Sequence, residues 1–235
     1  MLIGSQGNPL YRKCSFARSI MPERESRGFT AGQMLYPNLG VEADVFTLTS
    51  NKDLKDAAML QFYLVFVGIT LFVNGVRIYN SYATDTSKHI GIKDAAVVNL
   101  FTGIMGVVLL TVMVVRSTTT GDSLAPAAYS GLFVLTYIWL AINAFTGADG
   151  KAFGWFCLLV PFIGIPVAIL TFLSAVTGFD YWMVFSWLAW SVLWFMFFLL
   201  LVCQLPIGRL TGVVTAAQGI TTALMPALLN FWGII

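Results

Sequence analysis

The sequence predicts an all-α membrane protein, a bundle of six transmembrane helices preceded by a polar N-terminal extension. Of its 235 residues, 58% are hydrophobic and only 10% are charged, against about 25% charged in ordinary soluble domains. The mean hydropathy is +0.82. Six apolar runs each have about the 20 residues that a helix needs to cross the hydrocarbon core. These runs are Ala58–Tyr79, Ala95–Val115, Ala127–Phe145, Phe153–Val176, Tyr181–Leu205 and Thr211–Trp232.

The first 57 residues have a different composition. They hold 7 of the 13 basic and 6 of the 11 acidic residues. No apolar segment follows the first positive charges, as it would in a signal peptide. We expect residues 1–57 to be a polar, disordered extension and residues 58–235 to be the six-helix transmembrane channel domain. Ser50 and Asp53 have the spacing of a capping box, with Asp in place of Glu, so the first helix is expected to begin before the membrane.

The basic residues of the loops predict the orientation. Loops rich in Lys and Arg stay in the cytoplasm, and the first, third and fifth loops carry five of them against one in the second and fourth. The five are Arg77, Lys88, Lys93, Lys151 and Arg209, and the one is Arg116. Both termini are therefore expected outside, in the plasma (inner) membrane. The basic residues of the N-terminal extension favour the opposite orientation, but we follow the loops.

The six runs contain almost no Asp, Glu, Lys, Arg or His. Arg77, at the end of the first, is the exception. Charged groups inside a membrane mark proton relays and ion pathways, so their absence argues against a pump, a proton-coupled carrier and a channel with charged rings. With one histidine, His89, and no catalytic or metal-binding spacing, we expect neither an enzyme nor a bound metal or cofactor. The neutral polar groups that remain suit a small, neutral, polar solute, and nothing indicates nucleic acid as a partner.

Three tryptophans stand in the middle of the fifth run, in "WLAWSVLW". At about 100° per residue, Trp187, Trp190 and Trp194 fall within roughly 60° of one another around a helix. Rigid indoles on one face can narrow a pore to a flat slot, and their N–H groups can donate to the carbonyl oxygen of a planar amide or urea. The same spacing also fits packing against neighbouring helices or lipid, so both interpretations stay open.

Six segments resemble the UreI/AmiS family of urea and short-chain amide channels. The most specific is "DYWMVFSWLAWSVLW" (Asp180–Trp194). The others are "MLQFYLVFVGITLFVNG" (Met59–Gly75), "AVVNLFTG" (Ala96–Gly103), "TYIWLAIN" (Thr136–Asn143), "IPVAIL" (Ile165–Leu170) and "LPIGRLT" (Leu205–Thr211). Together they cover residues 59–232 in order, and the first 58 residues lie outside the resemblance.

The resemblance implies a passive channel for urea or short aliphatic amides. It implies a six-helix protomer with its own pore, a homohexameric ring around a lipid plug, both termini outside, and a functional link to a cytoplasmic urease or amidase. The implied pore-lining residues are Leu64, Val67, Leu71, Phe133, Tyr137, Trp187, Trp190, Leu193, Trp194 and Gln218. Of these, Tyr137, Trp190 and Trp194 are expected to form the inner slot.

Two departures from the acid-gated member of the family affect the expected regulation. Gln218 stands where that member has a glutamate, which alters selectivity between urea and amides in a direction the sequence does not give. The second and fourth loops contain no histidine, and His89 lies in the first, so we expect a pore that mild acid does not gate. A water or ammonia facilitator and a non-transporting membrane scaffold subunit remain as alternatives.

Overall fold

The computed structural model describes the backbone of residues 39–234 and the side chains of residues 58–234. The predicted disordered extension, residues 1–57, lies largely outside these ranges. Helix α1 (Leu39–Asn80) begins upstream of Ser50, so Ser50 lies inside the helix and not at its start. Between Gly40 and Ala58 there is no proline or glycine to end a helix. The chain divides into two units, Met1–Val45 and Phe46–Ile235, and the apolar helical spans belong to the second.

Six helical spans in the described residues are long and apolar enough to cross a membrane, which confirms the predicted bundle. The first is the apolar part of α1, Ala58–Asn80. A short 3-10 turn, η1 (Thr86–Lys88), precedes the second. The next four are α2 (Ile92–Thr120), α3 (Ala125–Thr146), α4 (Lys151–Ser174) and α5 (Gly178–Leu201). The sixth consists of α6 (Gly208–Gln218), a π-helical turn η2 (Gly219–Leu224) and α7 (Met225–Phe231).

Helix α5 begins earlier and ends earlier than the predicted run Tyr181–Leu205. A capping box sets its start: the Thr177 hydroxyl accepts the Asp180 N–H at 3.1 Å, and the Asp180 carboxylate accepts the Thr177 N–H at 2.8 Å. Its last residue is Leu201, because the chain then turns through Gln204, whose φ of 54° lies in the left-handed region. Apolar character therefore continues past the helix into the turn.

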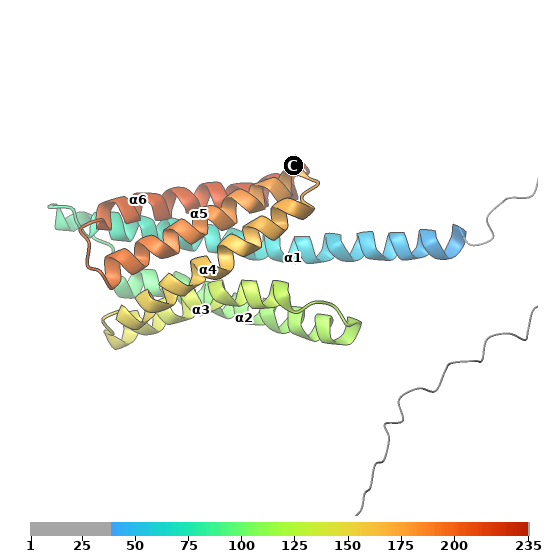
Figure 1. Ribbon diagram of the computed structural model, residues 1–235. Helices are drawn as coiled ribbons and strands as arrows, with labels where there is room; N and C mark the ends of the chain where they lie inside the picture. The colour runs from blue at the N-terminus through green and yellow to red at the C-terminus, as the bar shows by residue number, and fades with distance from the viewer. Residues whose placement is uncertain (1–38, 235) are drawn as a thin grey trace, which may run out of the picture. The chain divides into compact units, whose positions relative to one another are not determined.

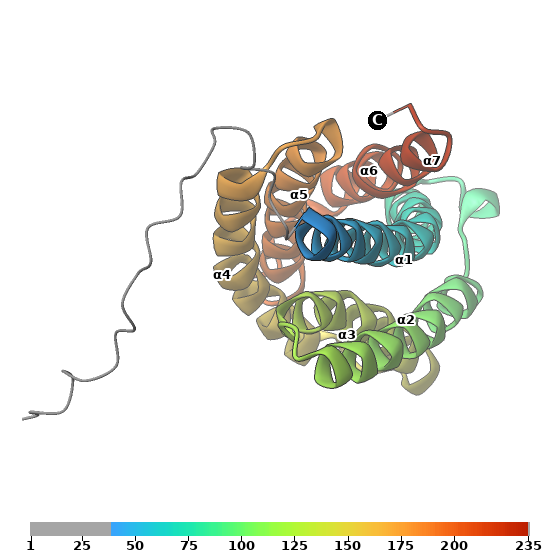
Figure 2. The same ribbon diagram turned by 90° about the vertical axis from the view of Figure 1, so that its right-hand side faces the viewer.

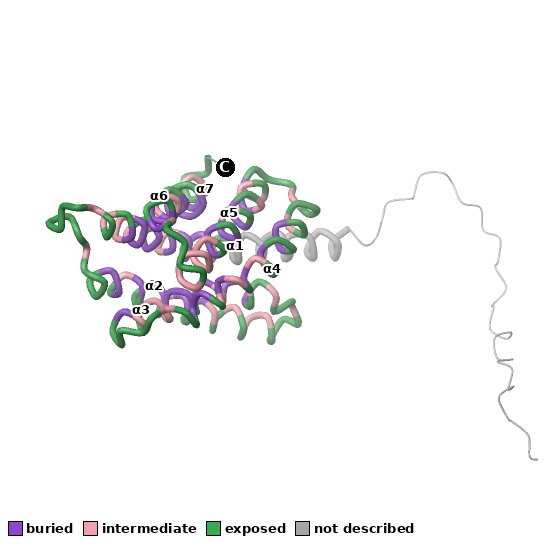
Figure 3. The backbone as a smooth tube through the Cα atoms, turned by 60° about the vertical axis from the view of Figure 1, so that its left-hand side comes forward, coloured by how far each residue is buried: buried purple, intermediate pink, exposed green. Residues whose placement is uncertain are grey.

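The helices of the second unit lie side by side (Figure 1). Viewed end-on, α1 lies in the middle, with the α2–α3 pair on one side and α5 and α6 on the other (Figure 2). Helix α4 packs along α5. Buried residues face inward and exposed residues face outward along the helices (Figure 3). The outward faces are apolar, with Phe162 on α4 72% exposed, as expected for surfaces that meet lipid or other membrane helices.

Glycines bring α1 against α6. A Cβ atom on Gly68 would lie 2.6 Å from the carbonyl oxygen of Gly219 in η2, and a Cβ atom on Gly75 would lie 2.6 Å from that of Gly212 in α6. A Cβ atom on Gly75 would lie 2.3 Å from the backbone nitrogen of Ala216, so only glycine fits at this crossing. Small residues commonly allow membrane helices to approach this closely. The contact fixes one side of α1 against the sixth span and leaves another side facing the interior.

Candidate functional site

A cavity of about 210 Å³ enters the bundle from one end. Its mouth lies where α1, α3 and α5 end and where α2 and α4 begin, at the loops that the sequence predicts to be cytoplasmic. The residues that line it come from all six spans and one turn: Leu71, Asn74, Arg77 and Ile78 of α1; Ile92, Ala95, Ala96 and Asn99 of α2; Phe133, Thr136, Tyr137, Leu140, Asn143 and Ala144 of α3; Ala148, Asp149 and Gly150 of the following turn; Phe153 of α4; Trp190, Leu193, Trp194, Phe197 and Leu201 of α5; and Thr215 of α6.

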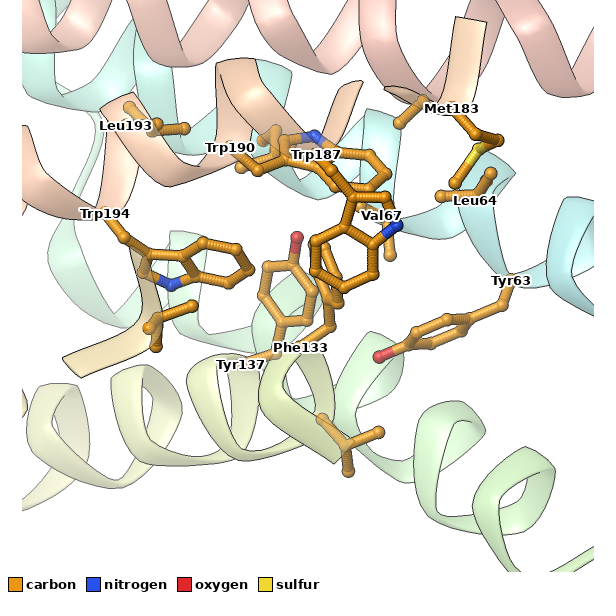
Figure 4. Close-up of a cluster of buried hydrophobic side chains, with 14 of the residues drawn as sticks. Tyr63, Leu64, Val67, Phe133, Tyr137, Met183, Trp187, Trp190, Leu193 and Trp194 are labelled. Carbon is orange, nitrogen blue, oxygen red and sulfur yellow. The ribbon is translucent and has the colours of Figure 1, made fainter. Parts of the chain in front are cut away.

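Aromatic rings close the deep end of the cavity. The ring of Phe133 lies 4.8 Å from that of Trp190, 4.9 Å from that of Trp194 and 5.9 Å from that of Trp187, between centroids. Figure 4 shows Phe133 and Tyr137 extending from α3 toward the three indoles of α5. The edge-to-face and tilted arrangements are those that aromatic side chains prefer. The three tryptophans therefore share one face, as their spacing predicts, and all three indoles contact the ring of Phe133.

The indole N–H of Trp190 points away from the cavity. It donates to the hydroxyl of Thr222, in the π-helical turn, at 2.8 Å. The expectation that this N–H is available to a carbonyl oxygen of the solute is therefore wrong for the described conformation. Trp194 Nε1 lies 3.4 Å from the hydroxyl of Thr136, which is a long hydrogen bond. Trp190 therefore presents its ring, and not its N–H group, to the deep end of the cavity.

Six of the ten residues predicted to line a pore line this cavity. They are Leu71, Phe133, Tyr137, Trp190, Leu193 and Trp194. The other four lie outside it: Leu64, Val67 and Trp187 belong to the buried cluster beyond Phe133, and Gln218 donates its amide N–H to the carbonyl oxygen of Ala189 at 2.9 Å. Contact of these four with a permeant stays a prediction. The Oε1 atom of Gln218 is buried with no hydrogen-bond partner in the described residues.

A pair of asparagines forms part of the cavity wall. Asn74 Nδ2 donates to Asn99 Oδ1 at 2.9 Å, and Asn99 Nδ2 donates back to Asn74 Oδ1 at 2.8 Å. Asn99 Nδ2 also donates to the carbonyl oxygen of Ala95 at 2.7 Å. The sequence places both asparagines among the neutral polar groups of the spans, but it does not predict that they pair, and they are not among the ten predicted pore-lining residues. The available signal was spacing, since Asn74 follows Leu71 by about one turn and so shares its face of α1.

The charged groups of the cavity lie near its mouth. Among the lining residues, Arg77 is partly buried, and Asp149 is exposed and forms an ion pair with Lys151 at 3.6 Å. No cluster of three or more metal-binding side chains occurs in the described part of the chain. Away from the mouth, the cavity wall therefore offers amide, hydroxyl and aromatic groups to a solute.

The loop between α1 and α2 carries the one histidine. The His89 ring is exposed, with Nε2 3.1 Å from the carbonyl oxygen of Ala83. In the same loop, Asp85 accepts hydrogen bonds from the hydroxyl of Ser87 at 2.6 Å and from its N–H at 3.0 Å. These bonds, with a smaller contribution from the neighbouring cations, lower the pKa of Asp85 below its ordinary value. Asp85 is therefore ionised in mildly acidic solution.

Comparison with known proteins identifies relatives of the membrane domain. The model of the AmiS/UreI family transporter matches residues 59–234. A protein of Mycolicibacterium smegmatis named "Putative amidate substrates transporter protein" is 35% identical over 169 residues, 71% of this chain and 73% of that protein. The acid-activated urea channel of Helicobacter pylori is 31% identical over 199 residues, 74% of this chain and 97% of the channel. The crystal structure of the H. pylori urea channel has a TM-score of 0.65 and 32% identity, covering 73% of this chain and 97% of that one.

Proposed function

The chain belongs to the AmiS/UreI transporter family, and from this premise we propose that it is a passive channel for urea and short aliphatic amides. It is an integral membrane protein with six helices long and apolar enough to span a bilayer. Relatives in this family are named for urea and for amidate substrates. The proposal extends that substrate class to this chain.

The chemistry of the cavity wall is the observation that carries the proposal. The uncharged part of this wall combines the neutral amides of Asn74 and Asn99 with the rings of Phe133, Trp190 and Trp194. Amide groups can donate and accept hydrogen bonds, and flat rings can confine a planar molecule. Urea and acetamide are planar, uncharged and rich in hydrogen-bonding groups, so they match both parts of this wall. Tyr137, Trp190 and Trp194 are the proposed inner slot.

The placement of charged groups supports passive transport without acid gating. Coupled carriers and pumps place such groups within the membrane. In the described spans the charged side chains lie near the helix ends, as with Arg77, Asp94 and Asp180. The single histidine of the chain, His89, lies in an exposed loop outside the spans. We therefore propose equal flux at neutral and mildly acid pH.

The setting in the cell is proposed on loop charge and family resemblance. The cavity mouth lies at the basic loops, which places it in the cytoplasm if both termini are outside the plasma membrane. A mouth on that side would deliver the permeant to a cytoplasmic urease or amidase. We also propose a homohexamer, in which part of each outward apolar face contacts neighbouring protomers and part contacts lipid. Native mass spectrometry of the detergent-solubilised protein measures this assembly.

Stopped-flow light scattering on proteoliposomes tests the channel. Urea and acetamide flux is measured for the parent, for Trp190→Ala and for Trp194→Ala. Trp155→Ala is the matched control, because Trp155 lies on the outward face of α4 and is 56% exposed. We expect flux well above empty liposomes, linear in solute concentration, changed several-fold by either cavity variant and unchanged by the control.

Other outcomes separate the alternatives. Water or ammonia flux without urea or acetamide flux would indicate a facilitator for those smaller molecules. No flux of any solute from folded protein would contradict the channel and favour the scaffold. Equal effects of all three tryptophan variants would contradict the proposed slot and leave the channel itself in place.

A further inference from the structure

The Asn74–Asn99 pair is a cyclic, reciprocal amide pair that joins α1 to α2. Both residues are buried, 7% and 3% exposed, and both line the cavity. Each amide donates one N–H to the oxygen of the other, at 2.9 and 2.8 Å. The arrangement is the one that two molecules of a simple primary amide adopt when they pair through their N–H and C=O groups. The cavity wall therefore displays the hydrogen-bonding pattern of an amide.

The pair keeps hydrogen-bonding capacity for a third group. A primary amide has two N–H donors and an oxygen with two lone pairs. Asn99 uses both donors, one toward Asn74 and one toward Ala95. Asn74 uses one donor in the pair, and each side-chain oxygen accepts one bond within it. One N–H of Asn74 and one lone pair on each oxygen are left for a group that enters the cavity.

A second hydrogen bond between the same helices provides a comparison. The hydroxyl oxygens of Thr70 on α1 and Thr102 on α2 lie 2.7 Å apart. Both residues are fully buried, and neither lines the cavity. Thr70 precedes Asn74 by about one helical turn, so the two helices are already joined next to the asparagines. Joining these helices does not by itself require amides in the cavity wall.

The position of the pair suits recognition before a solute reaches the aromatic end of the cavity. Along α1, Arg77, Asn74 and Leu71 follow one another about every 4.5 Å, at 1.5 Å per residue. Arg77 lies toward the mouth, and Leu71 lies toward the aromatic end. A solute entering from the mouth therefore meets the asparagines about 4.5 Å before it meets the rings.

We propose that Asn74 and Asn99 form a recognition site for primary amides between the mouth and the aromatic end of the cavity. A ligand with an N–H and a carbonyl oxygen on the same side of its C–N bond forms hydrogen bonds with the free groups of the pair. These replace the hydrogen bonds to water that the ligand loses at the aromatic end. The site admits urea, formamide and acetamide and disfavours solutes that lack this donor and acceptor on one edge. This inference rests on the proposed function, because it assigns selectivity to the same cavity.

Acetamide and N-methylformamide test the site as a pair of isomers. They have the same atoms and nearly the same size, but the N–H of N-methylformamide points away from its carbonyl oxygen in the favoured form of a secondary amide. We expect the parent to pass acetamide about fivefold faster than its isomer relative to empty liposomes, since one net hydrogen bond of about 1 kcal/mol corresponds to that ratio.

The variants separate recognition from helix packing. The double variant Asn74→Leu/Asn99→Leu replaces both amides by apolar groups of similar size, which leaves no unpaired partner. Thr70→Val/Thr102→Val is the matched control, because it removes the neighbouring bond between the same helices away from the cavity. We expect the leucine variant to bring the ratio near one and the valine variant to keep it. An unchanged ratio in the leucine variant, or an equal loss in both, would overturn the site.

Solid-state NMR tests the site on the parent protein if the leucine variant does not fold. With ¹⁵N-labelled asparagine in lipid bilayers, acetamide should shift the side-chain signals of Asn74 and Asn99, and N-methylformamide should not. Equal responses to the two isomers, or none, would overturn the proposal. Amide flux without isomer discrimination contradicts the site alone, whereas absence of any amide flux contradicts the proposed function.

Discussion

Replacing Thr222 with valine removes the acceptor of the Trp190 indole N–H and keeps the shape of the side chain. The bond is 2.8 Å long, and the two residues are 0% and 2% exposed. Water therefore does not reach the freed N–H. Because a buried donor left without its partner costs about 1–3 kcal/mol, we expect the free energy of unfolding to fall by that amount. The ring of Trp190 also loses its attachment to the sixth span, so urea flux should change as well.

Thr221→Val is the matched control for this variant. Both threonines donate to a carbonyl oxygen one turn back, Thr222 to Gln218 at 2.6 Å and Thr221 to Ala217 at 2.9 Å. Of the two side chains, only that of Thr222 accepts an indole N–H. Thr221 accepts the indole N–H of Trp182 at 2.7 Å through its backbone carbonyl oxygen, which the control variant keeps. The control should therefore change stability by no more than about 0.5 kcal/mol, as is usual for exposed positions.

Equilibrium unfolding in mixed detergent micelles, followed by circular dichroism, measures the difference. The ultraviolet resonance Raman signal of indole N–H groups reports separately whether a tryptophan has lost its acceptor. Thr222→Ser keeps the hydroxyl and should retain both the Raman signal and most of the stability. Equal losses for Thr222→Val and Thr221→Val would refute the reasoning, because the indole bond would then contribute nothing measurable.

Three further variants test the packing and the cavity mouth. The Tyr63 hydroxyl is buried without a hydrogen-bond partner in the described residues, so Tyr63→Phe should leave the free energy of unfolding unchanged or raise it by about 1 kcal/mol; a marked loss would contradict this. Gly75→Ala places a Cβ 2.3 Å from a backbone nitrogen of α6 and should lower the free energy of unfolding by about 1–3 kcal/mol. Gly131→Ala is its control and should leave stability unchanged, because a Cβ there has no neighbour closer than 3.9 Å. Arg77→Gln removes a cation at the mouth and should raise methylammonium flux by about fivefold, the effect of ~1 kcal/mol of repulsion in water, with Arg209→Gln as the control outside the cavity.

The sequence predicts the six spans well because their signal is local. Length and hydropathy identify an apolar helix without knowledge of its neighbours. The ends are less predictable. Leu205 is as apolar as the helix before it, yet the chain has already turned at Gln204. Conversely, the Thr177–Asp180 capping box fixes the start of α5 before the predicted run begins.

The tryptophans show which part of a site periodicity can predict. Spacing places Trp187, Trp190 and Trp194 on one face, and the structure places that face around Phe133. The direction of the Trp190 N–H depends on Thr222, which is 32 residues away in a π-helical turn. Local sequence patterns do not predict that turn. Spacing within one helix carries no information about that partner.

The pairing of the two asparagines could not be predicted for the same reason. Asn74 and Asn99 are 25 residues apart, and each alone is a neutral polar residue on an otherwise apolar helix. Their chemistry arises when α1 and α2 bring the two amides together. Which helices meet, and in which register, is decided by tertiary contacts such as the glycine crossing of α1 and α6.

Hydrogen bonding and confinement are thus separated along the cavity. Trp190 gives its N–H to Thr222, so the deep end offers ring surface more than donors. Asn74 and Asn99, about one turn nearer the mouth, offer amide groups. Because a polar group that loses water without a replacement costs about 1–3 kcal/mol, a solute must recover its hydrogen bonds before it meets the rings. A neutral amide can do so at the asparagine pair. An ion requires much more to replace its hydration, so we expect the proposed channel to favour neutral solutes.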